Sequence, residues 1–406
     1  MSDNIKILIN TLPKRLQPVA RFLRHQESAS GLSTTRYIQD VSTCLIPKAI
    51  FSRSIEDLTE NTFLETSEEA LIYLSPALVG EYAARKVFSK GLNNKLKEEV
   101  AETGETLLNK AKKSKIAKEN NKKVLPAKAA IALAATAIPL TEFSLNYIKN
   151  LLTLKLFNKS DFRNIASLEN NQEDKAHQEK VASSAKKHIK GAALVYAGLL
   201  SFAGLLAFKG KNSKILQKIS EFIVAPGNKL FSKNEKAKDF VNKYFCIDFN
   251  KSKTGKLVMS KGQLTTCVLV GGCGYFGASA DRGKENLKET ATRFPLVGLY
   301  VITGSELVQN GFKNYLFRKG KCKDVINNKK EVTPFEKLDE LAKKLAKEKG
   351  TTVEQEFKSI IKQKGLIFGL PYLFSLLVMG FFVAGMTVRA TKKRYENEQK
   401  KLNQAA

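Results

Sequence analysis

Long apolar segments alternate with lysine-rich polar segments along this chain. The longest apolar segment covers residues 365–388 and contains no charged residue, with Lys364 before it and Arg389 after it. A helix needs roughly 20 consecutive apolar residues to cross the hydrocarbon core of a bilayer. The pattern therefore predicts a membrane-spanning helix at 365–388.

Five weaker apolar segments precede this one. Each is shorter or is interrupted by a charge, as Glu142 interrupts segment 129–148. In the weakest segment, 66–88, only residues 70–80 are free of charge, so this segment fits either a span or an ordinary packed helix. The six segments predict an all-α fold, a polytopic helical membrane bundle of five or six spans. The five weaker segments are 66–88, 129–148, 191–208, 262–280 and 294–312.

The polar stretches divide the chain into five predicted regions. They are a basic N-terminal region with amphipathic segments (1–65), a first three-segment half (66–210), a basic connecting loop (211–261), a second three-segment half (262–390) and a basic tail (391–406). Within the first region, Ile5, Leu8, Ile9 and Leu12 repeat at helical spacing. That spacing predicts either a short helix on the membrane surface or a loosely ordered basic tail.

Two of the apolar segments share a pattern of polar residues. The pattern Glu-x-x-x-Asn-x-x-Lys-Asn occurs at 142–150 and again at 306–314, and segment 66–88 echoes it with Glu81 and Arg85. Matches in the same order predict two pseudo-repeated halves, which would lie in opposite orientations as in inverted-repeat transporters. The alternative is that helices flanked by lysine and rich in small residues resemble one another.

The net charge narrows the classes of partner. The chain has 406 residues, with 68 Lys and Arg against 39 Asp and Glu, a formal net charge of +29. Such a balance fits nucleic acid, anionic lipid or positively charged cytoplasmic loops. Few aromatic residues accompany the lysines, so a base-stacking surface for nucleic acid is not indicated. The expected partners are the lipid bilayer and, through the basic loops, anionic lipid.

Cysteine and histidine offer no recognisable chemistry. The five cysteines form no Cys-x-x-Cys pair, and the three histidines are scattered along the chain. Metal sites and catalytic triads need such residues at characteristic spacings. We therefore predict no metal, no cofactor and no catalytic residue.

Glu142 and Glu306 are the strongest candidates for function. A carboxylate within an apolar segment is costly unless it is neutral, paired or facing water. One hypothesis is that both line a polar cavity that binds a proton, a cation or a cationic substrate. The alternative is a structural clasp, in which each glutamate pairs with a basic residue of a neighbouring helix. The predicted pathway residues are Glu142, Asn146, Lys149, Glu306, Asn310 and Lys313, with Glu81 and Arg85 as weaker candidates.

Three functions follow from these features. The leading prediction is a multi-pass membrane protein for solute or ion translocation, with the two glutamates in the pathway. The main alternative is a membrane-embedded scaffold whose basic loops bind partners or anionic lipid. The third is an enzyme, because Gly-Cys-Gly-Tyr-Phe-Gly at 272–277 matches the dinucleotide-binding pattern after a strand-like run at 265–270. Gly-rich spans also produce this pattern through close helix packing.

Overall fold

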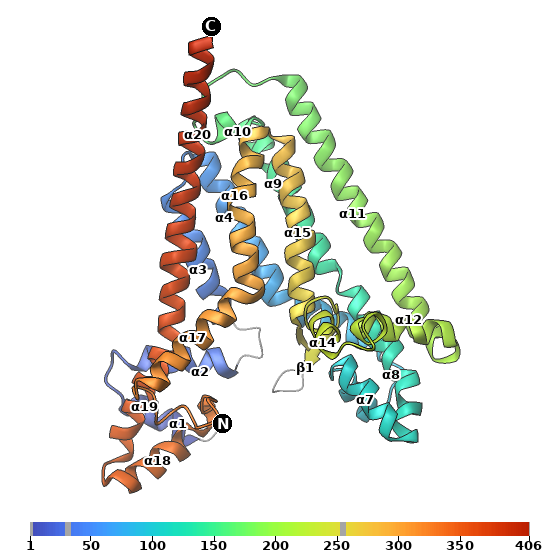
Figure 1. Cartoon of the computed structure of the whole chain (residues 1–406), viewed down its shortest axis with the longest axis vertical. Helices are drawn as coiled ribbons and strands as arrows, with labels where there is room; N and C mark the ends of the chain where they lie inside the picture. The colour runs from blue at the N-terminus through green and yellow to red at the C-terminus, as the bar shows by residue number, and fades with distance from the viewer. Residues whose placement is uncertain (1–2, 29–33, 252–256, 406) are drawn as a thin grey trace.

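The computed structural model describes residues 3–28, 34–251 and 257–405 (Figure 1). Helices make up 81% of the chain, which confirms the all-helical prediction. The described residues contain one short antiparallel hairpin, in which β1 (Phe249–Lys251) pairs with β2 (Leu257–Met259).

The helices fall into three consecutive groups along the chain. The first group is α1 (Asp3–Thr11), α2 (Gln17–Ser28), α3 (Thr34–Ile50), α4 (Ile55–Ser75), the π-helical η1 (Pro76–Ala84) and α5 (Arg85–Phe88). The second is α6 (Asn94–Glu99), α7 (Gly104–Lys113), α8 (Lys115–Ala134), α9 (Ala137–Phe157), α10 (Phe162–Ile165), α11 (Lys175–Lys209), η2 (Gly210–Asn212), α12 (Lys214–Val224), α13 (Gly227–Leu230) and α14 (Glu235–Tyr244). The third is α15 (Lys261–Asp281), α16 (Lys284–Leu299), the π-helical η3 (Tyr300–Gly304), α17 (Ser305–Arg318), η4 (Phe335–Lys337), α18 (Leu338–Lys349), α19 (Val353–Phe374), the π-helical η5 (Ser375–Phe382) and α20 (Val383–Ala405).

Three helical stretches are long and apolar enough to cross a membrane. They are Lys115–Phe157, Lys175–Asn212 and Val353–Gln404, and they contain the predicted segments 129–148, 191–208 and 365–388. Among the described residues the other three predicted segments are helical but do not reach this length and apolarity. The predicted count of five or six spans is therefore not confirmed beyond three.

These three stretches differ in how much protein surrounds them. In the most apolar part of Lys115–Phe157, 83% of the residues are buried, against 17% for Lys175–Asn212 and 22% for Val353–Gln404. The first stretch supplies α9, which packs against α4, α11 and α15. The other two lie along the sides of the bundle (Figure 1). Their apolar side chains consequently face outward, as the side chains of helices in lipid do.

Close packing between α9 and α15 depends on glycine. A Cβ placed on Gly274 would lie 2.5 Å from the carbonyl oxygen of Phe143, and one on Gly277 would collide with the hydroxyl of Tyr147. Small residues allow helix backbones to approach this closely. Residues 265–270 lie inside the helix α15, as the predicted helical segment 262–280 requires, so the strand that a dinucleotide-binding motif needs does not form there. The motif therefore serves helix packing, without the strand–turn–helix context of a nucleotide site.

A break separates α8 from α9 close to Pro139. Helix α8 ends at Ala134 and α9 begins at Ala137. Proline cannot donate a backbone hydrogen bond, and its ring clashes with the preceding turn. The break between the two helices thus lies just before the proline.

The N-terminal helix α1 packs into a small core with α18 and α19. Ile5, Leu8, Ile9 and Leu12 are buried together with residues of α18 and α19 such as Leu338 and Phe357. This amphipathic helix therefore packs against protein, and neither the surface helix nor the loose tail predicted from its spacing describes it. The predicted basic tail continues α20 as helix to Ala405.

A second core lies at the foot of α8. Residues 211–261, predicted as a connecting loop, contain α12, α13, α14 and the hairpin. Val224, Phe249 and Leu257 from this region are buried against Leu107 and Val124 of α7 and α8. This part of the chain is therefore a folded unit on the bundle.

Candidate functional site

A cluster of charged side chains lies inside the bundle, where apolar residues are expected. We call it the charged core. Its members come from the loop before α4 and from α4, α9, α16 and the end of α15. They are Arg53, Asp57, Glu60, Lys149, Arg282 and Glu289.

Arg53 connects α4 with α16. Its Nη1 and Nη2 donate hydrogen bonds to the two carboxylate oxygens of Glu289 at 2.8 and 3.1 Å. Its Nε donates to Asp57 Oδ2 at 3.0 Å. A planar guanidinium binds a carboxylate through two parallel hydrogen bonds, which fixes geometry as well as charge. Arg53 therefore holds the start of α4 against the middle of α16.

Glu60 connects α4 with α9 and α15. It accepts a hydrogen bond from Arg282 Nη1 at 2.7 Å, and Lys149 Nζ lies 3.8 Å from its carboxylate. The hydroxyl of Thr153 also donates to it. Arg282 is fully buried, and its Nε and Nη2 make no hydrogen bond in the described part of the chain. Because an unpaired buried charge is very costly, Glu60 is indispensable to this arrangement.

A small polar cavity lies beside the charged core. Its volume is about 40 Å³. Four cationic and three anionic side chains line it, namely Lys48, Arg53, Lys149, Arg293, Asp57, Glu60 and Glu289. A cavity needs only about 10–15 Å³ to hold one water molecule, so this one accommodates water or a small ion.

The predicted site residues on α9 are separated from one another. Glu142 packs against Gly271 of α15, and its buried Oε2 has no hydrogen-bond partner among the described residues. Asn146 is buried and donates to the backbone carbonyl of Glu142 at 3.3 Å. Lys149 alone reaches the charged core, where it lies near Glu60 and over the ring of Tyr275. The structure therefore brings Lys149 to a polar site and leaves Glu142 in a helix interface.

The predicted site residues on α17 lie at the surface of the chain. Glu306 is 48% exposed and pairs with Lys261 at the start of α15. Asn310 is exposed and Lys313 is half-buried. Lys261 and Gly271, the two contacts on α15, are about 15 Å apart along the helix axis, so the two glutamates do not meet.

The predicted internal repeat receives no support from these positions. One copy of the shared pattern lies on α9 in the interior of the bundle, whereas the other lies on the exposed α17. The echo at Glu81 and Arg85 is a local clasp, with an ion pair at 2.8 Å. Glu81 also accepts a hydrogen bond from the backbone of Leu257 at 2.9 Å. Glu81 thus ties η1 to the hairpin, while Arg85 donates a hydrogen bond to the carbonyl oxygen of Lys97.

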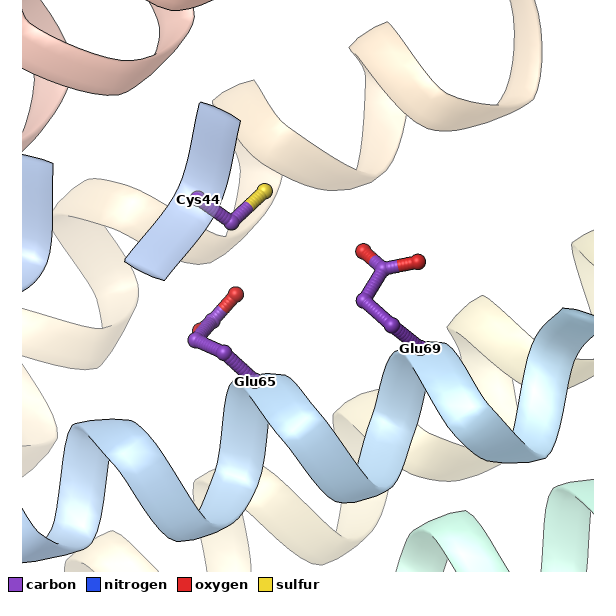
Figure 2. A group of neighbouring side chains, drawn as sticks. All are labelled: Cys44, Glu65 and Glu69. Atoms are coloured by element: carbon purple, nitrogen blue, oxygen red, sulfur yellow. The ribbon is translucent and has the colours of Figure 1, made fainter. Parts of the chain in front are cut away.

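One group of side chains has the donor atoms of a metal site. Figure 2 shows Cys44 on α3 facing Glu65 and Glu69, which lie one turn apart on α4. Their ligand atoms lie within 4.8 Å of one another. Thiolate and carboxylates suit a divalent cation such as zinc. The ammonium group of Lys48 pairs with Glu65, however, and supplies a positive charge to this group from within the chain.

A second buried ion pair lies at the foot of the bundle. Lys128 Nζ lies 2.7 Å from Asp248 Oδ1 and donates to the carbonyl oxygens of Val100 and Phe249. Burial raises the pKa of the Asp248 carboxyl, and the charge of Lys128 opposes this shift. The pair joins α8, part of one of the three long apolar stretches, to the start of the hairpin.

Sequence reasoning missed most of the charged core. Arg53, Glu60, Arg282 and Glu289 lie in stretches that are polar along the sequence, where charged residues usually face water. The sequence nevertheless contained a signal for a charged site, namely acidic residues that share one helix face. Asp57 and Glu60 share a face of α4, and Glu285 and Glu289 share a face of α16. No family model matches this chain, and no curated protein or solved structure is significantly similar to it. Function must therefore be argued from the site.

Proposed function

We propose that this protein is an integral, multi-pass membrane protein that acts as a helical scaffold. The outward-facing apolar surface of the bundle carries the first part of the proposal. In two of the three long apolar stretches only about a fifth of the residues are buried. Exposed apolar surface of this extent is costly in water and neutral in lipid.

Exposed apolar side chains on further helices extend the proposed number of spans to five or six. The π-helical segment η1 and the helices α15 to α17 carry exposed leucines within the same bundle. They are Leu78, Leu269, Leu296, Leu299 and Leu307. A bundle with only three spans would leave these side chains in water.

The ion pairs of the charged core favour a scaffold. Arg53 with Glu289, and Arg282 with Glu60, are held by short hydrogen bonds from different helices. Pairs of this kind fix the relative positions of helices, which is the role that the clasp hypothesis gave to Glu142 and Glu306. The cavity beside them is too small for an organic solute, which would need several hundred cubic ångströms.

Ion translocation is the second candidate. It is supported by the cavity of about 40 Å³, whose lining has one more cation than anions. Ionisable groups within a membrane commonly mark ion pathways. Under this proposal Lys149 and Arg53 would attract a small anion, and Glu142 would lie beside the pathway and not in it.

Alkaline carbonate extraction of membranes from producing cells tests the shared part of both proposals. We expect the protein to remain in the pellet, and its release into the supernatant would contradict membrane embedding. Chloride flux into liposomes containing the purified protein then separates the two. A scaffold gives no flux above empty liposomes, whereas flux that is lost on Lys149→Met with unchanged folding would favour translocation.

A further inference from the structure

A large basic groove lies at one end of the bundle. It has a volume of about 1000 Å³ and lies between α7, the start of α8, and α12 to α14. Its floor is rigid, since the buried Asn121 of α8 donates a hydrogen bond to the carbonyl oxygen of Leu107 in α7 at 2.7 Å. The groove is separate from the charged core and shares no residue with its cavity.

Lysine dominates the lining of this groove. Seven lysines face three glutamates there, and the glutamates are engaged by Lys229 and Lys238 at one side. Four lysines form no salt bridge in the part of the chain that the structure describes, namely Lys112, Lys113, Lys115 and Lys118. Like charges gathered in this way repel one another, and a bound anion would relieve that repulsion.

The start of α8 increases the positive potential. Ser114 caps this helix by accepting a hydrogen bond from the backbone of Ala117, and the first turn contains no acidic residue. The N-terminus of a helix carries a partial positive charge, which normally attracts acidic side chains. Here Lys115 and Lys118 occupy these positions instead. The lysines at the end of α7 complement that helix's dipole, whereas those on α8 oppose the dipole of α8.

The helices that form one side of the groove also carry exposed phenylalanines. Phe222, Phe231, Phe240 and Phe245 lie on or beside α12 and α14, and each is more than 40% exposed. Figure 1 shows α12 and α14 nearly end-on between the feet of α11 and α15, so both cross the direction of the long helices. Lysine together with exposed aromatic side chains on helices that lie across a bundle is typical of a membrane interface.

The position of the groove along α8 agrees with such an interface. The apolar run of this helix begins at Ala129, about 10 Å along the axis from Lys122 and about 20 Å from Lys115. The headgroup layer on either side of the hydrocarbon core is about 5–8 Å deep, and lysine side chains extend along apolar surface to bring their ammonium groups to such a layer. If the apolar run lies in the bilayer, Lys122 therefore lies next to the headgroup layer, and Lys115 and Lys118 lie on its aqueous side and extend toward it.

We propose that this groove binds the phosphate headgroup of an anionic phospholipid from the membrane that the bundle crosses. The inference rests on the proposed membrane embedding and specifies the partner of one surface. Ammonium groups and helix N-terminal amides bind the phosphate, and the phenylalanines contact the adjoining acyl chains.

Native mass spectrometry of the full chain in detergent tests this site. The protein is titrated with phosphatidylglycerol, phosphatidylcholine or inorganic phosphate, and retained adducts are counted. A triple variant, Lys113→Gln, Lys115→Gln and Lys118→Gln, removes three groove lysines. Its control, Lys343→Gln, Lys344→Gln and Lys347→Gln, removes three exposed lysines of α18. We expect phosphatidylglycerol affinity to fall about 100-fold in the groove variant only.

Each outcome decides the proposal. Equal retention of the two lipids by the unmodified protein would overturn it, whatever the variants do. Equal loss in both triple variants would show that general surface charge, not the groove, holds the lipid. Displacement of phosphatidylglycerol by equimolar inorganic phosphate would point to a soluble phosphate ligand instead. Carbonate extraction reports separately on membrane embedding. If the protein stays in the pellet but shows no preference for phosphatidylglycerol, the lipid-binding groove is disproved and the proposed embedding still stands.

Discussion

Arg53 and Glu289 are 236 residues apart in the chain and share two hydrogen bonds of 2.8 and 3.1 Å in the bundle. Each side chain is less than 15% exposed. Removing one member of a buried ion pair leaves the other charge without compensation. The relationship therefore couples the start of α4 to α16 across more than half of the sequence.

Neutralising one member of this pair will destabilise the protein. We expect Arg53→Met to lower the free energy of unfolding by about 3–5 kcal/mol, since Glu289 then stays buried and unpaired. The double change Arg53→Met and Glu289→Met will recover part of this loss, because Glu289 is no longer buried and unpaired and only Asp57 has lost its cationic partner. Thermal unfolding in detergent measures both. A single variant as stable as the unmodified protein would show that the pair contributes little.

The second ion pair gives a pH-dependent prediction. In Lys128→Met the charge that opposes the raised pKa of Asp248 is lost, so the folded state favours the protonated carboxyl more strongly. A raised pKa in the folded state means that stability is lost as pH rises from the unfolded value, about 3.9, through the folded value. Lys128→Met will therefore be less stable at pH 8 than at pH 5.

Two controls accompany the Lys128 variant. The double variant Lys128→Met and Asp248→Leu carries no buried carboxyl, so its stability will vary less between pH 5 and pH 8. The unmodified protein shows how the stability varies with pH because of all the other titratable groups. If Lys128→Met followed the same pH profile as the unmodified protein, Asp248 would not be the responsible group.

Glycine at position 274 is required by the packing of α15 on α9. We expect Gly274→Leu to destabilise the bundle by more than about 3 kcal/mol, the upper end for overpacked cores, because the colliding atoms belong to the backbone of Phe143. Gly198→Leu is the matched control, as nothing lies within 4 Å of a Cβ placed on this glycine of α11. Detergent-solubilised thermal unfolding distinguishes them. Comparable losses in both variants would point to helix propensity instead of the close approach.

The two predicted glutamates will tolerate removal of their charge. Glu306 is half exposed, so Glu306→Gln removes a pair worth less than about 1 kcal/mol. Glu142 has a buried oxygen without a partner, so Glu142→Gln will leave stability unchanged or raise it. Unfolding and chloride flux, measured on the double variant Glu142→Gln and Glu306→Gln, test whether these glutamates are needed for stability or for transport. Folded protein that loses a flux shown by the unmodified chain would place both glutamates in a pathway.

The apolar segments were predictable because hydropathy is a local property of the chain. Residues 129–148, 191–208 and 365–388 all lie in long apolar helices, and the break before Pro139 follows from one proline ring. The basic character of residues 211–261 was also visible in the sequence. A sequence does not show, however, whether such a stretch is a loop or, as for 211–261, a folded unit.

Tertiary structure alone decided which charges meet. The cost of Glu142 in an apolar run is legible from the sequence, but its position against Gly271 depends on how α9 and α15 cross. The pairing of Arg53 with Glu289 likewise requires the loop before α4 to lie beside α16, which is far away along the chain. Burial of Ile5 and Leu12 against α18 and α19 is decided in the same way. Local pattern thus determines helices and their apolar faces, whereas partners are selected by packing between residues distant in sequence.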